Sequence, residues 1–202
     1  MPTESHGDRR RRQILAAAAD LSTSEGLETL SFSRIAAEVG LTKAGVAAHF
    51  ESKEALQLAV IRTAAAQYSA PLLVAATGTE PGVERLRALA LAWFEHLESI
   101  GFRGGCFFGS AAPAFAGRPG PVRDELALHT KSLVSMLEEQ AALALRLGEV
   151  SQRSSPELLV FQIHALAQEA NLRRELLGLE DSFEQARDAL SDLLSHYSRK
   201  LQ

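Results

Sequence analysis

The stretch from residue 31 to residue 53 constrains the fold of this 202-residue chain more than any other part of its sequence. Its first apolar residues recur at helical spacing, and they are Ile35, Ala36 and Val39. Gly40 follows them, where the end of a helix favours a residue that tolerates positive φ, and Thr42 is a good N-cap for a second helix. Two helices joined by a short turn containing glycine are typical of a helix-turn-helix.

The second predicted helix runs from residue 43 to residue 49, and its outward side chains are small or basic. The outward residues are Lys43, Ala44, Gly45, Ala47 and Ala48. A slim face of this kind suits a helix that lies in a major groove about 12 Å wide. The helix N-terminus, with Thr42 and Lys43, also suits phosphate oxygens. The segment therefore indicates a recognition helix for double-stranded DNA.

An ordered set of short motifs around this segment resembles the TetR family of transcriptional repressors. The motifs are Ser24-Glu25-Gly26-Leu27, Ile35-Ala36, Gly40-Leu41-Thr42-Lys43, His49-Phe50 and Ser52-Lys53-Glu54. The resemblance implies an all-α fold with two domains. Residues 1–54 would hold an N-terminal tail and a three-helix helix-turn-helix DNA-binding domain, and residues 55–202 a helical ligand-binding and dimerisation domain. The family usually has an aromatic residue where this chain has Ala47, so one phosphate contact of the family is not expected here.

The residues expected to contact DNA follow from the predicted helices and from the resemblance. They are Arg12, Ser31, Ser33, Arg34, Thr42, Lys43, Ala44, Gly45, Ala47, His49 and Lys53. The four arginines at positions 9–12 have two interpretations: a solvated helix start, or a basic arm that reaches the DNA. Cations at a helix N-terminus oppose the helix dipole, which favours the arm.

Bulk properties narrow the class of protein. The formal net charge is −4, so DNA binding must rest on local basic residues and on dimerisation rather than on the overall field. The single cysteine excludes an intramolecular disulfide. No apolar run approaches 18 residues, so no membrane span is expected, and the polar N-terminus does not resemble a signal peptide. We therefore expect a cytoplasmic protein.

Periodicity predicts helices along most of the chain. Outside the helix-turn-helix, the expected helices cover residues 13–24, 53–74, 83–100, 106–112, 121–147, 156–177 with Ser155 as its cap, and 182–201. Residues 1–7 are expected to form a loose tail, and Pro71 to kink or end its helix. The last two helices have apolar faces that suit a four-helix dimer interface, two from each subunit. Alternatively, they complete the core of a monomer.

A ligand cavity in the C-terminal part would need mostly apolar walls and a few placed polar groups. The candidate lining residues are Trp93, Phe94, Leu97, Cys106, Phe107, Phe108, Phe115, His129, Leu133, Met136, Phe161, His164 and Gln168. His129 and His164 have two interpretations, as hydrogen-bonded core histidines or as polar anchors for a ligand. Cys106 is either a buried structural cysteine or an oxidant sensor favoured by its glycine-rich segment and by Arg103.

The sequence has no pattern typical of an enzyme. The histidines are scattered singly, and HExxH, CxxC, GxSxG and phosphate-loop motifs do not occur. We therefore expect no cofactor, no metal site and no catalytic residue.

The function that the sequence favours is a homodimeric transcriptional repressor. It would bind a pseudo-palindromic DNA operator and be released by an unknown small-molecule effector. One rival is a helical enzyme or cofactor-binding bundle. Another is a dimeric interaction protein whose helix-turn-helix no longer binds DNA.

Overall fold

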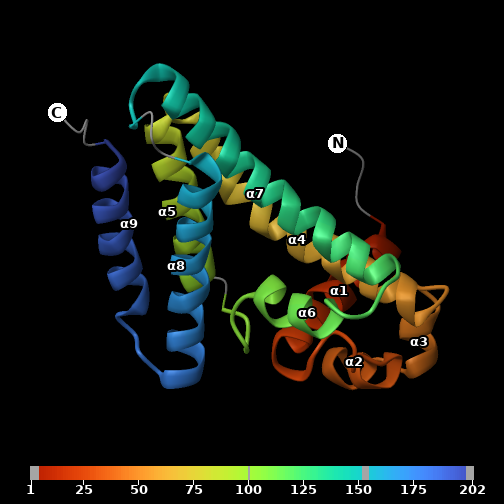
Figure 1. The fold of residues 1–202 in the computed structure, drawn as a ribbon. Helices are drawn as coiled ribbons and strands as arrows, with labels where there is room; N and C mark the ends of the chain where they lie inside the picture. Colours follow the sequence, from red (N-terminus) through yellow and green to blue (C-terminus); the bar gives the residue numbers. More distant parts are fainter. Residues whose placement is uncertain (1–4, 100, 152–154, 199–202) are drawn as a thin grey trace. The chain divides into compact units, whose positions relative to one another are not determined.

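A computed structural model describes residues 5–99, 101–151 and 155–198, and these residues form helices joined by turns, with no strand among them (Figure 1). The helices are α1 (His6–Glu25), α2 (Phe32–Val39), α3 (Lys43–Ala47), α4 (Lys53–Thr77), α5 (Val83–Ser99), α6 (Phe107–Phe115), α7 (Pro121–Leu147), α8 (Pro156–Leu177) and α9 (Ser182–Ser198). The all-α class expected from the sequence is confirmed.

The described chain divides into two compact units. The first unit comprises the described parts of residues 1–67 and 102–129, and the second those of 68–101 and 130–202. Helices α4 and α7 each contribute their N-terminal part to the first unit and their C-terminal part to the second. This grouping is by contact, so the division by function after residue 54 stays a prediction.

The core of the first unit is built from the helix-turn-helix and from segments distant in sequence. Ile14 of α1, Ile35 of α2 and Val46 of α3 are fully buried together. Phe107 and Ala111 of α6 join the same cluster, as does the start of α7. Each large apolar side chain buried here stabilises the fold by about 1.5–3 kcal/mol. The unit is therefore larger than the three helices that the sequence predicted.

Side-chain caps and one glycine set the turn between α2 and α3. Ser31 Oγ accepts the Arg34 N–H at 3.1 Å at the start of α2, and Thr42 Oγ1 accepts the Gly45 N–H at 3.0 Å at the start of α3. Gly40 between them has φ 67°, a left-handed conformation that favours glycine.

Helix α3 ends at Ala47, two residues before the end predicted from the sequence. The chain tightens there, because the N–H groups of His49 and Phe50 bond to carbonyls three residues back.

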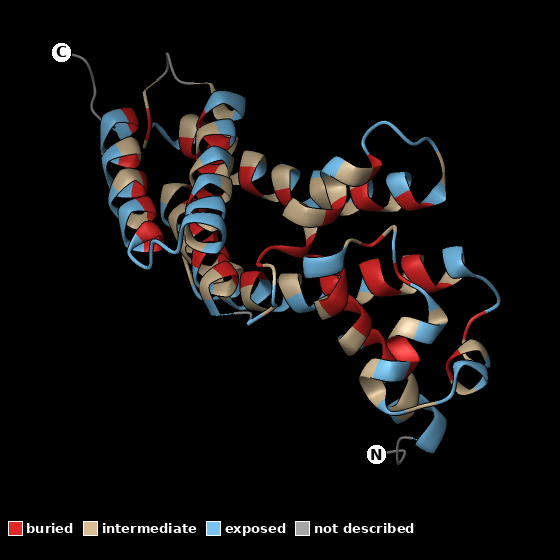
Figure 2. Ribbon diagram, turned by 90° about the horizontal axis from the view of Figure 1, so that it is seen from below, coloured by how far each residue is buried: buried red, intermediate tan, exposed pale blue. Residues whose placement is uncertain are grey.

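The second unit packs α5 against α8 and α9, and α8 lies beside α9 in Figure 1. Its largest fully buried side chains include Trp93 and Phe94 of α5 and Phe183 of α9. Gly178, with φ 67°, ends α8, and a turn of four residues makes the two last helices antiparallel neighbours. Figure 2 shows buried residues on the inner sides of these helices and exposed residues on their outer sides.

Other helix boundaries also differ from the sequence predictions. Helix α1 begins at His6 rather than at Gln13, because Ser5 caps it by accepting the Asp8 N–H at 3.1 Å. The four arginines therefore lie inside a helix, and the rest of the predicted tail, residues 1–4, is outside the described residues. Helix α6 covers Phe107–Phe115 rather than residues 106–112. The predicted ends of the helices at residues 100 and 201 are also outside the described part.

Pro71 does not end α4, which continues to Thr77. A proline inside a helix lacks one N–H donor, but the flanking turns can keep their own hydrogen bonds. Among the described helices, α4 is the one whose length and mean hydropathy of 1.3 would suffice to cross a membrane. The sequence prediction of no membrane span looked for an uninterrupted run of apolar residues. Helix α4 has no such run, but its mean hydropathy is high. Leu56, Val60 and Ile61 of this helix are fully buried in the first unit, and 28% of its apolar 18-residue window is buried.

Candidate functional site

The outer side of α3 is open, and its inner side anchors it. Val46 is fully buried, and Phe50 just after the helix stacks on Phe32 of α2 with ring centroids 6.5 Å apart. Lys43 is exposed at the first position of the helix, and Ala44 is exposed on the side away from Val46. The first unit therefore presents a short helix whose free face carries one cation and small side chains.

The predicted DNA contacts outside α3 lie on α1, on α2, in the turns beside α2 and α3, and at the start of α4. Arg12, Ser31, Ser33, Thr42 and Lys53 are exposed, and Arg34 is half-buried. Within and after α3, Gly45, Ala47 and His49 are half-buried. The structure thus brings all of these residues into the first unit, and their contacts with DNA stay predictions.

Two of the predicted cations already have partners. Arg34 pairs with Glu25 at 2.7 Å and with Glu38 at 2.9 Å, and hydrogen bonds to these carboxylates raise the pKa of Arg34 above its ordinary value. Lys53 Nζ donates to the Glu28 carbonyl oxygen at 2.6 Å. A phosphate contact by either residue would be shared with, or would replace, these bonds.

Arg11 has a role that the sequence did not predict. Its Nη1 donates to the His49 carbonyl oxygen at 3.1 Å, and its guanidinium lies 4.6 Å from the centre of the Phe50 ring. The contact ties α1 to the end of α3. The run of arginines was the available signal, but only the tertiary structure shows that Arg11 contacts the end of α3.

Cys106 is buried and caps α6, because its Sγ accepts the Gly109 N–H at 3.3 Å. Arg103 had been expected to favour a reactive thiolate. Its guanidinium instead pairs with Asp20 and Glu38. The geometry is that of a structural cysteine, and the redox role stays an untested hypothesis.

The predicted ligand-pocket residues do not gather in one unit. In the second unit lie Trp93, Phe94, Leu97, Leu133, Met136, Phe161, His164 and Gln168. In the first lie Cys106, Phe107, Phe108, Phe115 and His129. The cause is the apolar face of α6, which packs into the core shared with α1. His129 lies 3.3 Å from the Glu125 carboxylate and beside the Phe108 ring, so it has partners within the first unit.

The second unit contains a cluster of aromatic and imidazole rings around Trp93. The Trp93 ring centre lies 5.3 Å from that of His164 and 6.2 Å from that of Tyr68, and Tyr68 lies 5.2 Å from His96. Burial lowers the pKa of both His96 and His164, so both imidazoles are neutral near pH 7. Trp93 Nε1 and His96 Nε2 are buried, and neither atom has a hydrogen-bond partner within the described residues. Sequence analysis missed Tyr68 and His96, which carry no motif.

A cavity of about 380 Å³ lies between α7 and α8 in the same unit. It is lined by Thr130, Val134, Glu138, Glu157, Val160, Phe161 and His164. Of the predicted pocket residues, Phe161 and His164 therefore face one cavity, and His164 connects it to the ring cluster. No group of three or more metal-ligating side chains occurs within the described chain.

Comparison with protein families decides the identity. A family model described as bacterial regulatory proteins of the tetR family matches residues 14–60, and one described as a tetracyclin repressor-like C-terminal domain matches residues 82–190. The chain belongs to the TetR family. It is a DNA-binding transcriptional regulator, and its family is one of regulators rather than enzymes.

Several solved structures share this fold. A TetR transcriptional regulator from Chloroflexus aurantiacus is 24% identical over 96% of this chain and 98% of its own, with a TM-score of 0.85. A TetR-family regulator from Agrobacterium tumefaciens is 19% identical over 96% and 100%, with a TM-score of 0.82. AibR, solved with isovaleryl coenzyme A and operator DNA, is 24% identical over 94% and 98%, with a TM-score of 0.71. No curated protein matches this TetR-family chain.

Proposed function

We propose that this TetR-family regulator is a cytoplasmic homodimeric repressor that binds a pseudo-palindromic operator and leaves it when a small molecule binds the C-terminal domain. Residues 1–54 would bind DNA, and residues 55–202 would bind the effector and the second subunit. The observation that carries the proposal is the open, cation-bearing face of α3 on an anchored helix-turn-helix.

The DNA contact would be made by α3 in the major groove. Lys43 would supply a donor to a base edge or a phosphate, and the alanines would let the helix approach the base pairs closely. Exposed Ser31 and Thr42 would meet phosphates beside the groove. Two copies of α3 related by two-fold symmetry require two half-sites in opposite orientations.

Dimerisation is supported by an apolar stripe on the outer side of α8. Leu158, Phe161, Leu172 and Leu176 follow one another at helical spacing and are 51–72% exposed. A stripe of large exposed apolar side chains on a soluble protein marks a contact surface. A second copy of α8 would cover it.

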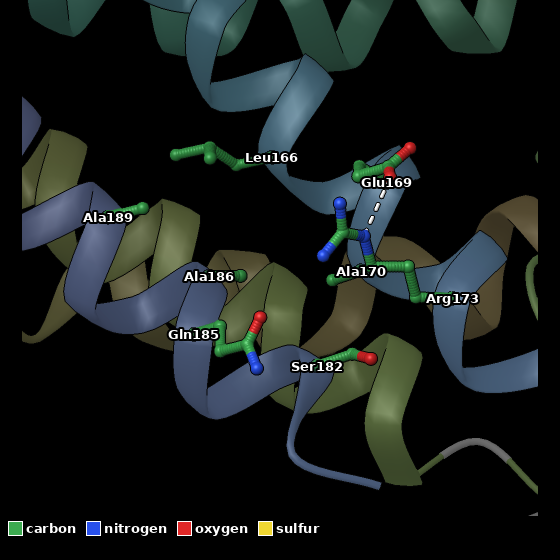
Figure 3. A pocket seen from close by; sticks show the side chains of 8 residues that line it. All are labelled: Leu166, Glu169, Ala170, Arg173, Ser182, Gln185, Ala186 and Ala189. Atoms are coloured by element: carbon green, nitrogen blue, oxygen red, sulfur yellow. Dashed lines mark hydrogen bonds and ion pairs between the residues drawn. The ribbon is translucent and has the colours of Figure 1, made fainter. Parts of the chain in front are cut away.

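A groove between α8 and α9 continues this surface and has a volume of about 250 Å³ (Figure 3). The floor of the groove is formed by small residues, and Ala170 and Ala186 face each other there. The Glu169–Arg173 ion pair at 2.7 Å lies along one rim. Small residues let a partner helix approach closely. The groove therefore suits the large side chains of the partner's α8 in a four-helix contact.

The effector would enter the second unit. The α7–α8 cavity supplies apolar walls from Val134, Val160 and Phe161, and the ring cluster behind His164 supplies unbonded donors. AibR was solved with an acyl coenzyme A. That likeness concerns the fold, so the effector of the present chain is left to experiment. The effector must bind the released conformation more tightly than the DNA-bound one.

A gel shift with the DNA upstream of the chain's own gene tests the DNA-binding part. We expect a retarded complex whose affinity falls about tenfold or more for Lys43→Ala, because each subunit loses one donor to DNA. Lys131→Ala, which removes an exposed lysine of α7, is the matched control and should bind as the wild type does.

If wild-type protein forms no complex with this DNA, a duplex selected from a random library takes its place. Failure to select any duplex would contradict the proposal. Mass spectrometry of the purified protein under non-denaturing conditions tests for the effector, and an extra mass released on unfolding identifies it.

A further inference from the structure

Residues 102–105, which we call the strap, follow directly on the second of three places where the chain passes between the two units. The strap crosses α1 and makes three hydrogen bonds or ion pairs there. The Arg103 N–H donates to Asp20 Oδ1 at 2.9 Å, the Arg103 Nε lies 2.9 Å from Asp20 Oδ2, and the Gly104 N–H donates to Thr23 Oγ1 at 3.0 Å.

The strap lies against the backbone of α1 as well as its side chains. A Cβ placed on Gly104 would lie 2.2 Å from the Thr23 carbonyl oxygen, which no real side chain could do. Glycine at this position is therefore required by the close approach. The strap and the C-terminal half of α1 form one tightly fitted contact.

Arg103 also reaches α2, the first helix of the helix-turn-helix. Its Nη2 donates to Glu38 Oε1, while Arg34 of α2 holds the other oxygen of the same carboxylate at 2.9 Å. Hydrogen bonds from Arg103 and then from Arg34 lower the pKa of Glu38, so this carboxylate is ionised at neutral pH. One guanidinium thus joins the strap to both α1 and α2.

We propose that Arg103 is a positioning residue for DNA binding: it holds α2, and through the α2–α3 turn the DNA-reading helix α3, at a set angle to α1. Glu38 lies two residues before Gly40 and four before the Thr42 cap, so a shift of α2 moves α3. The guanidinium is suited to the task because its planar fork can bind two carboxylates at once, which a lysine ammonium does less rigidly.

This inference rests on the proposed DNA-binding function, and its test uses a duplex selected from a random library by the wild-type protein. Arg103→Gln should weaken binding of that duplex about fivefold, since contacts within one ion-pair network couple at this level. Arg103→Lys keeps the charge and should recover only part of the loss. Arg62→Gln, which removes the 2.8 Å Arg62–Glu125 pair elsewhere in the first unit, should bind as wild type.

A double-mutant cycle distinguishes positioning from a general loss of stability. In the Asp20→Asn, Glu38→Gln background, Arg103→Gln should have no further effect on affinity. A full additional loss there would overturn the proposal. Amide exchange at residues 32–39 should also quicken in Arg103→Gln while exchange in α9 is unchanged, and protected α2 amides in the variant would count against it.

The salt dependence of binding separates positioning from direct contact with DNA. The slope of log affinity against log salt should be the same for wild type and Arg103→Gln. A slope lower by about one would mean that Arg103 binds a phosphate itself, and the positioning role would be wrong. If the wild type selects no duplex, the proposed function fails. If it selects one that Arg103→Gln binds equally well, only this inference fails.

Discussion

At the scale of single residues, the contact between the strap and α1 depends on the absence of a side chain at Gly104 as well as on the charge of Arg103. The strap can approach α1 only because no Cβ stands between it and the Thr23 carbonyl. A backbone oxygen cannot move aside as a flexible side chain can, so the fit has little tolerance. The strap's hydrogen bonds to α1 depend on that fit.

Gly104→Ala should lower the free energy of unfolding by about 2 kcal/mol, because the new methyl group overlaps backbone atoms. Urea denaturation followed by circular dichroism measures it. Gly117→Ala is the matched control, since a Cβ there would meet no atom within 4 Å, and it should change stability by less than about 1 kcal/mol. Equal effects of the two substitutions would contradict this account of the strap.

The burial of Cys106 predicts an unreactive thiol. A buried sulfur that caps a helix is shielded from oxidants and from thiol reagents. In native protein we expect the thiol to react with Ellman's reagent far more slowly than in urea. Cys106→Ser should leave operator binding unchanged, with or without peroxide. Release of wild-type protein by peroxide, lost in Cys106→Ser, would instead establish an oxidant sensor.

At the scale of helices, two half-buried histidines, His96 of α5 and His164 of α8, belong to the ring cluster around Trp93. His164 contacts the Trp93 ring directly, and His96 lies one turn further along α5, against Tyr68. Burial disfavours a charged imidazole at both positions, and no acidic side chain is an ion-pair partner of either in the described chain. Protonation should therefore loosen this pair of helices.

The sign of the resulting pH dependence follows from the lowered pKa values. The unfolded chain takes up protons first as the pH falls, since its histidines have the ordinary pKa of 6.5. The stabilisation is complete above about pH 6.5 and declines as the pH falls through that value toward the folded pKa. Urea unfolding at pH 7.5 and pH 5.5 should show this loss. The loss of stability between these two pH values should be smaller in the double variant His96→Gln, His164→Gln. It should be unchanged in His6→Gln, which alters an exposed residue of α1.

At the scale of the whole molecule, the proposed dimer would offset the charge of −4, which provides little general attraction for DNA. Two reading helices bound to one duplex multiply their affinities through effective concentration. Operator binding should therefore be lost when the dimer is lost, even if each helix-turn-helix stays folded.

Phe161→Glu, Leu172→Glu should convert the proposed dimer into a monomer, because two charges would be buried on the α8 stripe. Analytical ultracentrifugation measures the mass, and circular dichroism confirms that the helices remain. Leu73→Glu, which changes a leucine of intermediate exposure between these two on α4, is the control and should stay dimeric. A double variant that remains dimeric would place the subunit contact elsewhere.

Much of the fold was accessible from local patterns. The helical spacing of Ile35, Ala36 and Val39, the glycine after them and the Thr42 cap predicted α2, the turn and α3, and all three are present. These features depend on residues within a few positions of one another. The extension of α1 to His6 was missed because four consecutive cations oppose a helix start, and the Ser5 cap with Asp8 in the first turn offsets them.

The candidate sites were less predictable. The same apolar pattern in α6 suits a ligand pocket or a core, and only packing shows that Phe107 and Phe115 lie in the core with α1. The ring cluster includes Tyr68 and His96, which nothing in the sequence distinguishes from other half-buried residues.

By itself, the sequence determined the helices, their caps and the small residues on the exposed side of α3, because helix periodicity and capping act over three or four residues. The tertiary structure alone decided which of four adjacent arginines turns toward His49, and which carboxylates Arg103 meets. Those contacts join residues 38 to 83 positions apart. Long-range contacts of this kind follow from how helices pack, and no local pattern encodes that packing.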